Sequence, residues 1–183
     1  MLFRLGLVRT FQASNLFKDM TVWESLVVAH HLQFSSGFWG RFLNLPSTQR
    51  DLKASRRRAE ELLTFLRLAE FREELSKNLP HGHQRALGIA VALGADPRLL
   101  LLDEPVTGMN PEETTEMMDR IREIRQRGIT IVIIEHDMKA IMGLSDRVLA
   151  MGSGRKIAEG RPEEIQHNKE VIESYLGAEE DGV

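Results

Sequence analysis

Residues 98–105 read RLLLLDEP, and this stretch decides the fold class of the 183-residue chain. Leu99 to Leu102 are all apolar, so a strand formed here would bury both of its faces. Such a run is typical of a central parallel strand that helices cover. Asp103 and Glu104 follow directly. They place two acids at the carboxyl end of the strand, where open α/β sheets bind their ligands.

The segments after this strand continue the pattern. Asn110 is an N-cap signal and predicts a helix that ends at Gly128. Residues 129–134 (ITIVII) predict a second buried strand, and residues 147–151 predict a third, which a Gly-Ser-Gly turn converts into a hairpin. The alternation of strands and helices indicates an α/β fold with a parallel sheet.

The first half of the chain is expected to be mainly helical. Thr21 and Glu24 have the spacing of a capping box, which predicts a helix through His31. Apolar residues at three- and four-residue spacing predict another helix over residues 49–75. Between them, residues 33–47 mix Gly, Ser and Pro with aromatics, which favours a loop or a short broken helix.

Composition narrows the class of protein. The formal net charge is only −3, which disfavours a general nucleic-acid binder with a strongly basic face. The absence of cysteine excludes disulfides, thiolate zinc sites and cysteine nucleophiles. The longest apolar stretch, residues 86–95, is too short to span a bilayer, and the N-terminus is a poor signal peptide because arginines interrupt its apolar run. We therefore expect a cytosolic, reducing setting.

Polar residues also follow the second predicted strand, in the sequence Ile133-Ile134-Glu135-His136-Asp137. If the two strands are neighbours, Asp103, Glu104 and His136 meet at one edge of the sheet. One acid for magnesium, a second to activate water and a histidine for a phosphate oxygen would suit phosphoryl transfer. The simpler interpretation is a core strand with a polar turn and a histidine at a helix start.

Residues 78–84 (NLPHGHQ) precede an apolar helix. A glycine turn at a helix N-terminus presents free backbone amides to an anion, although an ordinary helix start reads the same way. His81 and His83 could in principle chelate a metal, but no acid or cysteine flanks them as a third ligand, so we do not expect a metal site there.

Five segments in a fixed order carry a resemblance: RTFQ (9–12), LPHGHQRALGIA (79–90), RLLLLDEP (98–105), VTGMNP (106–111) and IEHD (134–137). In this combination the chain resembles, over nearly all of its length, the ATP-binding subunit of ATP-binding-cassette (ABC) transporters. MNPEET, IEHDMK and the ending VIESYLG resemble most the longer, G-type ATPase subunit of branched-chain amino-acid importers. The resemblance implies a partial P-loop NTPase core with a parallel sheet plus a helical subdomain, and ATP and Mg²⁺ as cofactors.

The resemblance also implies roles for single residues. Gln12 would be the glutamine of the Q-loop, which touches magnesium and the attacking water and senses the membrane subunit. Asp103 would be the Walker B acid that serves magnesium, and Glu104 the adjacent general base. His136 would be the switch histidine.

Further roles fall on the signature and the D-loop. The signature sequence, which reads the γ-phosphate of ATP held by the opposite subunit, would comprise Leu79, Pro80, His81, Gly82 and His83. Asn110 stands where the D-loop usually has Asp. Early residues of the helical part (Phe17, Met20 and Trp23) would meet the coupling helix of the permease, unless they belong to the core.

Three departures from the family pattern stand out. His83 replaces the expected glutamine at the end of the signature, and Val91 stands where the family usually has Arg; both would weaken the signature side of the site. No G-x-x-x-x-G-K-S/T sequence occurs, and the nearest match, residues 154–156, lacks the spacing. Family members carry this P-loop upstream of the Q-loop. We therefore expect the hydrolysis machinery and the signature without the main grip on the phosphates.

The resemblance divides the chain into four parts. Residues 1–12 would hold the end of the N-terminal core portion and the Q-loop, and residues 13–95 the helical subdomain with the signature and its helix. Residues 96–160 would form the RecA-like α/β core with Walker B, D-loop and H-loop. Residues 161–183 would form C-terminal helices and an acidic tail.

Two functions remain open from the sequence. The first is an ATPase subunit that powers amino-acid import, peripheral at the cytoplasmic face of the inner or plasma membrane. It would pair with a second ABC ATPase subunit (as homo- or heterodimer) and with transmembrane permease subunits, indirectly with a periplasmic substrate-binding protein, and with no nucleic acid. The alternative is a truncated, non-catalytic product that at most pairs with an intact ABC subunit. A cassette ATPase of repair or translation fits less well, because the paired cassettes or long insertions usual there are missing.

Overall fold

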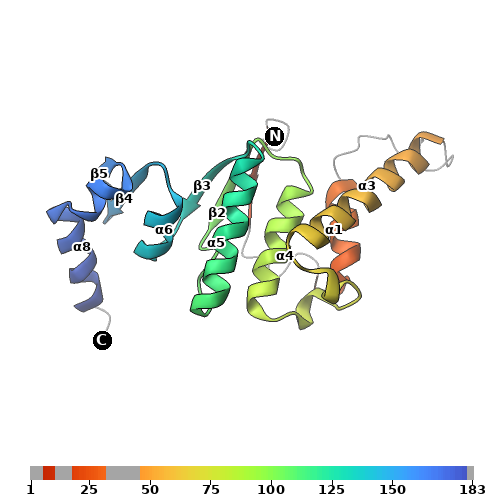
Figure 1. Ribbon diagram of the computed structural model, residues 1–183, viewed down its shortest axis with the longest axis horizontal. Coiled ribbons are helices and arrows are strands. Elements are labelled where there is room, and N and C mark those ends of the chain that lie inside the picture. The colour runs from red at the N-terminus through yellow and green to blue at the C-terminus, as the bar shows by residue number, and fades with distance from the viewer. Residues whose placement is uncertain (1–5, 11–17, 32–45, 181–183) are drawn as a thin grey trace. The chain divides into compact units, whose positions relative to one another are not determined.

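The computed structural model describes residues 6–10, 18–31 and 46–180, which fall into two compact units (Figure 1). The first unit extends to Ile134 and the second begins at Glu135. Elements of the first unit are β1 (Leu7–Arg9), α1 (Val22–His31), α3 (Pro46–Phe65), η3 (Ala69–Phe71), η4 (Ser76–Asn78), α4 (His81–Leu93), β2 (Leu99–Asp103), α5 (Pro111–Gln126) and β3 (Thr130–Ile134). Those of the second are α6 (Met138–Leu144), β4 (Val148–Gly152), β5 (Arg155–Gly160), α7 (Pro162–Gln166) and α8 (Lys169–Glu180).

The sheet of the first unit is parallel and has the order β1-β2-β3. The LLLLD strand, β2, is therefore central, as the sequence predicts. Leu100 and Leu102 on one of its faces are fully buried. On α5 the buried residues are Met117, Ile121 and Ile124, at helical spacing. These side chains belong to the buried apolar residues of the first unit.

The other face of the sheet is less well covered. Leu101 is paired with Val132, and Asp103 with Ile134, so these four residues share a face. Val132 is 42% exposed and Ile134 is 53% exposed. The prediction that residues 129–134 form a buried strand is therefore wrong, since one face of β3 is exposed and Ile131 and Ile133 on the other are only half-buried. Among the described residues β3 pairs only with β2, and an edge strand covered on one side shields only alternate side chains, here in part.

The third predicted strand does not join the parallel sheet. β4 pairs with β5 in a separate, antiparallel two-stranded sheet. The predicted hairpin is confirmed. Ser153 and Gly154 at its tip both have positive φ, 47° and 77°, as a two-residue turn matched to the twist of the strands requires. Because this turn joins the two strands directly, β4 takes its hydrogen bonds from β5.

In the helical region, α1, α3 and α4 pack together. The capping box of α1 is confirmed, with Thr21 N donating to Glu24 Oε2 (2.9 Å) and Glu24 N to Thr21 Oγ1 (3.1 Å). The predicted helix over residues 49–75 is wrong beyond Phe65. There Arg67 adopts φ +53°, and the bonds Leu68 N–Leu63 O and Arg67 N–Thr64 O close a Schellman motif. The end of this helix could not be predicted from the sequence, because arginine occupies the left-handed position where glycine is usual.

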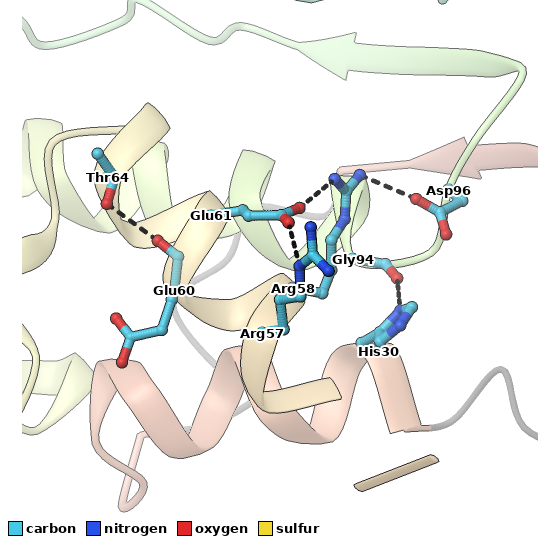
Figure 2. A network of polar contacts seen from close by, with 8 residues as sticks. All are labelled: His30, Arg57, Arg58, Glu60, Glu61, Thr64, Gly94 and Asp96. Carbon is cyan, nitrogen blue, oxygen red and sulfur yellow. Dashed lines mark hydrogen bonds and ion pairs between the residues drawn. The ribbon is translucent and has the colours of Figure 1, made fainter. Parts of the chain in front are cut away.

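A polar network holds this helical bundle to the segment that enters β2 (Figure 2). Arg58 of α3 donates to Glu61 (3.3 Å) and to Asp96 (2.8 Å), in the loop between α4 and β2. His30 Nδ1 of α1 lies 3.0 Å from the carbonyl oxygen of Gly94. Partial burial raises the pKa of Glu61, but hydrogen bonds and charge from Arg58 and Arg57 outweigh it and hold the pKa below its ordinary value. These bonds join α1 and α3 to the segment between α4 and the central strand.

Within the described residues, no helix combines the length and the apolarity that crossing a membrane would require.

The open face of the sheet generates a prediction about association. Because Val132 and Ile134 expose apolar surface on β3, an edge strand among the described residues, the purified 183-residue chain should form oligomers in static light scattering. Replacing both residues by Thr keeps β-branching and removes apolar surface, so V132T/I134T should shift the weight-average mass toward the monomer.

The matched control is I172T on α8, where a 40% exposed isoleucine lies outside the sheet. It should leave the mass unchanged. A parent chain that is monomeric and unfolds in one sharp calorimetric transition would contradict this account of the open face.

Candidate active site

Asp103 and Glu104 lie at the carboxyl edge of the central strand, as the sequence predicts. Asp103 is the last residue of β2, and Glu104 N donates to the carbonyl oxygen of Ile134 at the end of β3 (2.9 Å). The carboxylate of Asp103 accepts a 2.7 Å hydrogen bond from Arg9 Nη2 at the end of β1. All three strands of the sheet thus contribute to holding the two acids.

Glu104 has an unusual backbone, with φ +47°. The left-handed region is uncommon for a residue with a side chain, and such residues cluster at functional sites. The bond to Ile134 and a long one (3.5 Å) from Thr107 Oγ1 to Glu104 Oε2 support this conformation. The chain therefore turns sharply after Asp103, so the two neighbouring acids are held by different partners.

Asn110 is confirmed as the N-cap of α5. Its side chain accepts from Glu112 N (3.0 Å) and Glu113 N (2.9 Å), and Glu113 Oε2 accepts from Asn110 N (3.0 Å). This complete capping box fixes the entry into α5.

The predicted signature forms the start of α4. Leu79 is buried, and Gln84 Nε2 donates to its carbonyl oxygen (2.9 Å). Pro80 occupies the N-cap and makes no side-chain capping bond, so the amides of the first turn point out from the positive end of a 13-residue helix. This geometry suits an anion, as expected from the glycine turn.

The signature turn is joined to the segment between Glu104 and α5. His81 Nε2 lies 3.3 Å from the carbonyl oxygen of Thr107. A Cβ placed on Gly108, which has φ +79°, would lie 3.3 Å from the same ring nitrogen. A Cβ on Gly82 would lie 3.3 Å from Glu113 Oε1. The two motifs therefore form one close-packed unit in the folded chain.

His83 has a packing partner that the sequence did not reveal. Its ring lies 4.5 Å, centroid to centroid, from the ring of Phe71 in η3. Its Nδ1 is buried without a hydrogen-bond partner in the described part of the chain. His83, which replaces the glutamine of the signature pattern, thus packs in part against η3.

The remaining predicted residues are placed as follows. Gln12 and Phe17 lie outside the described residues. His136 belongs to the second unit, where its N–H donates to Glu135 Oε2 (3.1 Å) and its side chain is 70% exposed. Met20 is exposed, and the Arg72 guanidinium lies 3.9 Å from the centre of the Trp23 ring. Trp23 is half-buried, so of these two side chains Met20 is the exposed one, and the contact role that the family resemblance implies stays a prediction.

The acid edge fits magnesium that arrives with a nucleotide. Mg²⁺ commonly takes only one or two protein carboxylates and completes its shell with water and phosphate oxygens. Asp103 can supply such a carboxylate. Across residues 6–10, 18–31 and 46–180 no three His, Cys, Asp or Glu side chains gather in a group that could hold a metal ion by themselves, and His81 and His83 gain no third ligand.

Comparison with known proteins identifies the family. The ABC transporter family matches residues 2–107, and the branched-chain amino acid ATP-binding cassette transporter family matches residues 155–181. The high-affinity branched-chain amino acid transport ATP-binding protein LivG of Escherichia coli is 43% identical over 175 residues, covering 95% of this chain and 69% of the relative. The chain belongs to the ABC transporter ATP-binding family.

Other members agree. The corresponding protein BraF of Pseudomonas aeruginosa is 39% identical, again over 95% of this chain and 69% of the relative. A solved ATP-binding cassette of an ABC transporter matches with a TM-score of 0.77 and 28% identity, covering 95% of this chain and 70% of that one. A nucleotide-free cassette matches with a TM-score of 0.75 and 27% identity, over the same shares. These matches confirm the predicted ABC ATPase fold with its parallel sheet and helices.

One site residue was not predicted from the sequence. Arg9 is part of the RTFQ segment, of which only Gln12 received a role. Its pairing with Asp103 depends on the register between β1 and β2, where Arg9 lies opposite Leu101. Residues 101 and 103 share a face, so period-two alternation would have placed Arg9 beside the acid, had the pairing of the two strands been known.

Two glycines with the same backbone conformation test the packing between the signature and the segment after Glu104. Gly108 and Gly128 have φ of +79° and +85°, but only at Gly108 would a Cβ meet another group, the His81 ring. Both alanine variants should lose about 1 kcal/mol of stability from the left-handed backbone. G108A should lose roughly 1 kcal/mol more because the ring must move.

The difference is measured as the gap between the two variants' free energies of unfolding in urea. Equal losses for G108A and G128A would show that the signature turn and Gly108 are not packed together in solution.

Proposed function

We propose that this chain is the ATP-hydrolysing part of an ABC importer subunit for branched-chain amino acids. The observation that carries the proposal is the pair Asp103–Glu104 at the carboxyl edge of the central strand, in a chain 43% identical to a branched-chain amino acid transport ATP-binding protein. The proposed reaction is hydrolysis of ATP to ADP and phosphate.

Glu104 acts as the general base in this proposal. Its carboxylate accepts a proton from the attacking water, and the backbone turn fixes it one residue beyond the strand. Asp103 would hold Mg²⁺, which when bound supplies charge neutralisation at the phosphate oxygens. Gln12 would touch the magnesium and the water, and His136 would contact a phosphate oxygen.

The start of α4 would read the γ-phosphate of ATP that an opposite subunit holds. In this stretch of Leu79, Pro80, His81, Gly82 and His83, the last three residues supply the first-turn amides at the positive helix end, which favour an anion. The bond of His81 to Thr107 would couple this turn to Asn110 and α5. His83 packs on Phe71, so histidine in place of the family's glutamine would weaken one phosphate contact without opening the fold.

The proposed assembly follows from the family. A second ABC ATPase subunit would face the signature, permease subunits would contact the surface near Met20 and Trp23, and a periplasmic binding protein would act indirectly. The chain would work peripherally at the cytoplasmic face of the membrane. In this proposal residues 1–12 form the end of the N-terminal core portion and the Q-loop, and residues 13–95 the helical subdomain. Residues 96–160 form the catalytic core, and residues 161–183 the C-terminal helices and the acidic tail.

The 183 residues contain no G-x-x-x-x-G-K-S/T sequence, and this affects how firmly the chain can bind the phosphates of ATP. In P-loop NTPases that loop supplies the amides and the lysine that cradle the phosphates. The 183-residue chain would therefore be inactive alone. The alternative function, a non-catalytic product that pairs with an intact ABC subunit, uses the same signature surface and is favoured by the complete, well-packed start of α4.

A chimera with the N-terminal segment of the E. coli relative ahead of this chain tests the two acids. E104Q keeps size and hydrogen bonding but removes the proton acceptor, so steady-state ATP hydrolysis should fall by roughly two or more powers of ten while ATP binding persists. D103N should instead weaken Mg–ATP binding itself.

The matched control is E123Q, which exchanges an exposed acid near the far end of α5 for its amide. It should retain turnover, because Glu123 lies outside the capping box and the signature turn. If E104Q turns over within about twofold of the parent chimera, Glu104 is not the base.

A further inference from the structure

Arg9 and Asp103 form a fixed charge pair on one face of the sheet. The register pairs Arg9 with Leu101, and Asp103 lies two residues further along the same face. Arg9 Nη2 and Asp103 Oδ2 are 2.7 Å apart, and the two side chains are 52% and 27% exposed. The bond engages one oxygen of a carboxylate that offers about four acceptor positions. Asp103 can therefore accept further partners while it remains bonded to Arg9.

This ion pair is expected to add little to the stability of the fold. Ion pairs between partly exposed side chains typically contribute between about 0 and 1 kcal/mol. The pair nevertheless changes what Asp103 can bind. A carboxylate alone attracts any divalent cation, but a guanidinium beside it repels a free cation that approaches the same oxygens.

A metal bound to a nucleotide meets the opposite situation. The Mg–ATP complex carries net negative charge and exposes phosphate oxygens, and arginine is the side chain best suited to donate hydrogen bonds to such oxygens. The same guanidinium that repels free Mg²⁺ would therefore attract Mg–ATP. Arg9 would therefore lower the affinity for the free metal ion and raise the affinity for the metal–nucleotide complex.

We propose that Arg9 makes Asp103 selective for a metal ion that arrives with a nucleotide over the free metal ion. Arg9 is a specificity-determining residue in this account, and the inference rests on the proposed role of Asp103 as the magnesium acid. It predicts that the chain does not collect free divalent cations at its acid edge before ATP is present.

The experiment measures Mn²⁺ binding to the 183-residue chain by water-proton relaxation, once with Mn²⁺ alone and once with Mn²⁺ and excess ATP. R9Q should bind Mn²⁺ alone about threefold to tenfold more tightly and Mn–ATP more weakly by a similar factor, the range expected for one partly screened charge. R9K keeps the charge and should preserve the parent's preference to within about twofold.

The matched control is R57Q, which removes an arginine from an exposed pair with Glu61 and changes the net charge equally. It should leave both affinities unchanged. If R9Q changes both affinities in the same direction, or changes neither, the selectivity is overturned, and a loss of the preference in R9K overturns the role of charge.

D103N separates this inference from the proposed function. In the R9Q background, D103N should abolish the gain in Mn²⁺ affinity. If D103N has no effect on Mn²⁺ in either background, Asp103 is not the metal acid and both proposals fail. If D103N lowers Mn²⁺ affinity but R9Q does not raise it, only the role of Arg9 fails.

Discussion

The parallel pairing of β2 between β1 and β3 is the constraint on which the rest of the structure depends. A central strand takes hydrogen bonds from both neighbours, so its register fixes which residues reach the sheet edge together. That register brings Arg9 to Asp103 and the end of β3 to Glu104. A shift by one residue would turn Asp103 toward the face that now buries Leu100 and Leu102. The chemistry at the edge therefore depends on the apolar pattern inside the strand.

Much of this fold could be predicted because its signals are local. Four consecutive leucines indicate a central strand, Asn110 with Glu113 indicates a helix start, and Gly-Ser-Gly indicates a hairpin; each depends on residues a few positions apart. The structure confirms all three. The two acids of the candidate site follow the four leucines directly, which is why the residue order alone places them at the sheet edge.

The features that the sequence did not disclose depend on tertiary context. Arg67 ends α3 by adopting a left-handed backbone conformation, which arginine rarely adopts at a helix end. The exposed face of β3 carries the apolar residues Val132 and Ile134, so composition alone did not show that this face is exposed. The bonds from Arg9 to Asp103 and the ring contact of His83 with Phe71 join residues far apart in the chain. Propensity carries no information on such pairs, which only strand register and helix packing create.

The central proposal is that Glu104 is the base and residues 79–83 the signature of an ABC ATPase site, and that these 183 residues, which contain no G-x-x-x-x-G-K-S/T sequence, hold the phosphates of ATP only weakly. The most direct test is a titration of a fluorescent ATP analogue with Mg²⁺ against the 183-residue chain and against the chimera with the N-terminal segment of the E. coli relative. The account predicts that the chimera binds at least about a hundredfold more tightly, since the added loop supplies the phosphate cradle. Tight, saturable, magnesium-dependent binding by the 183-residue chain alone would contradict it.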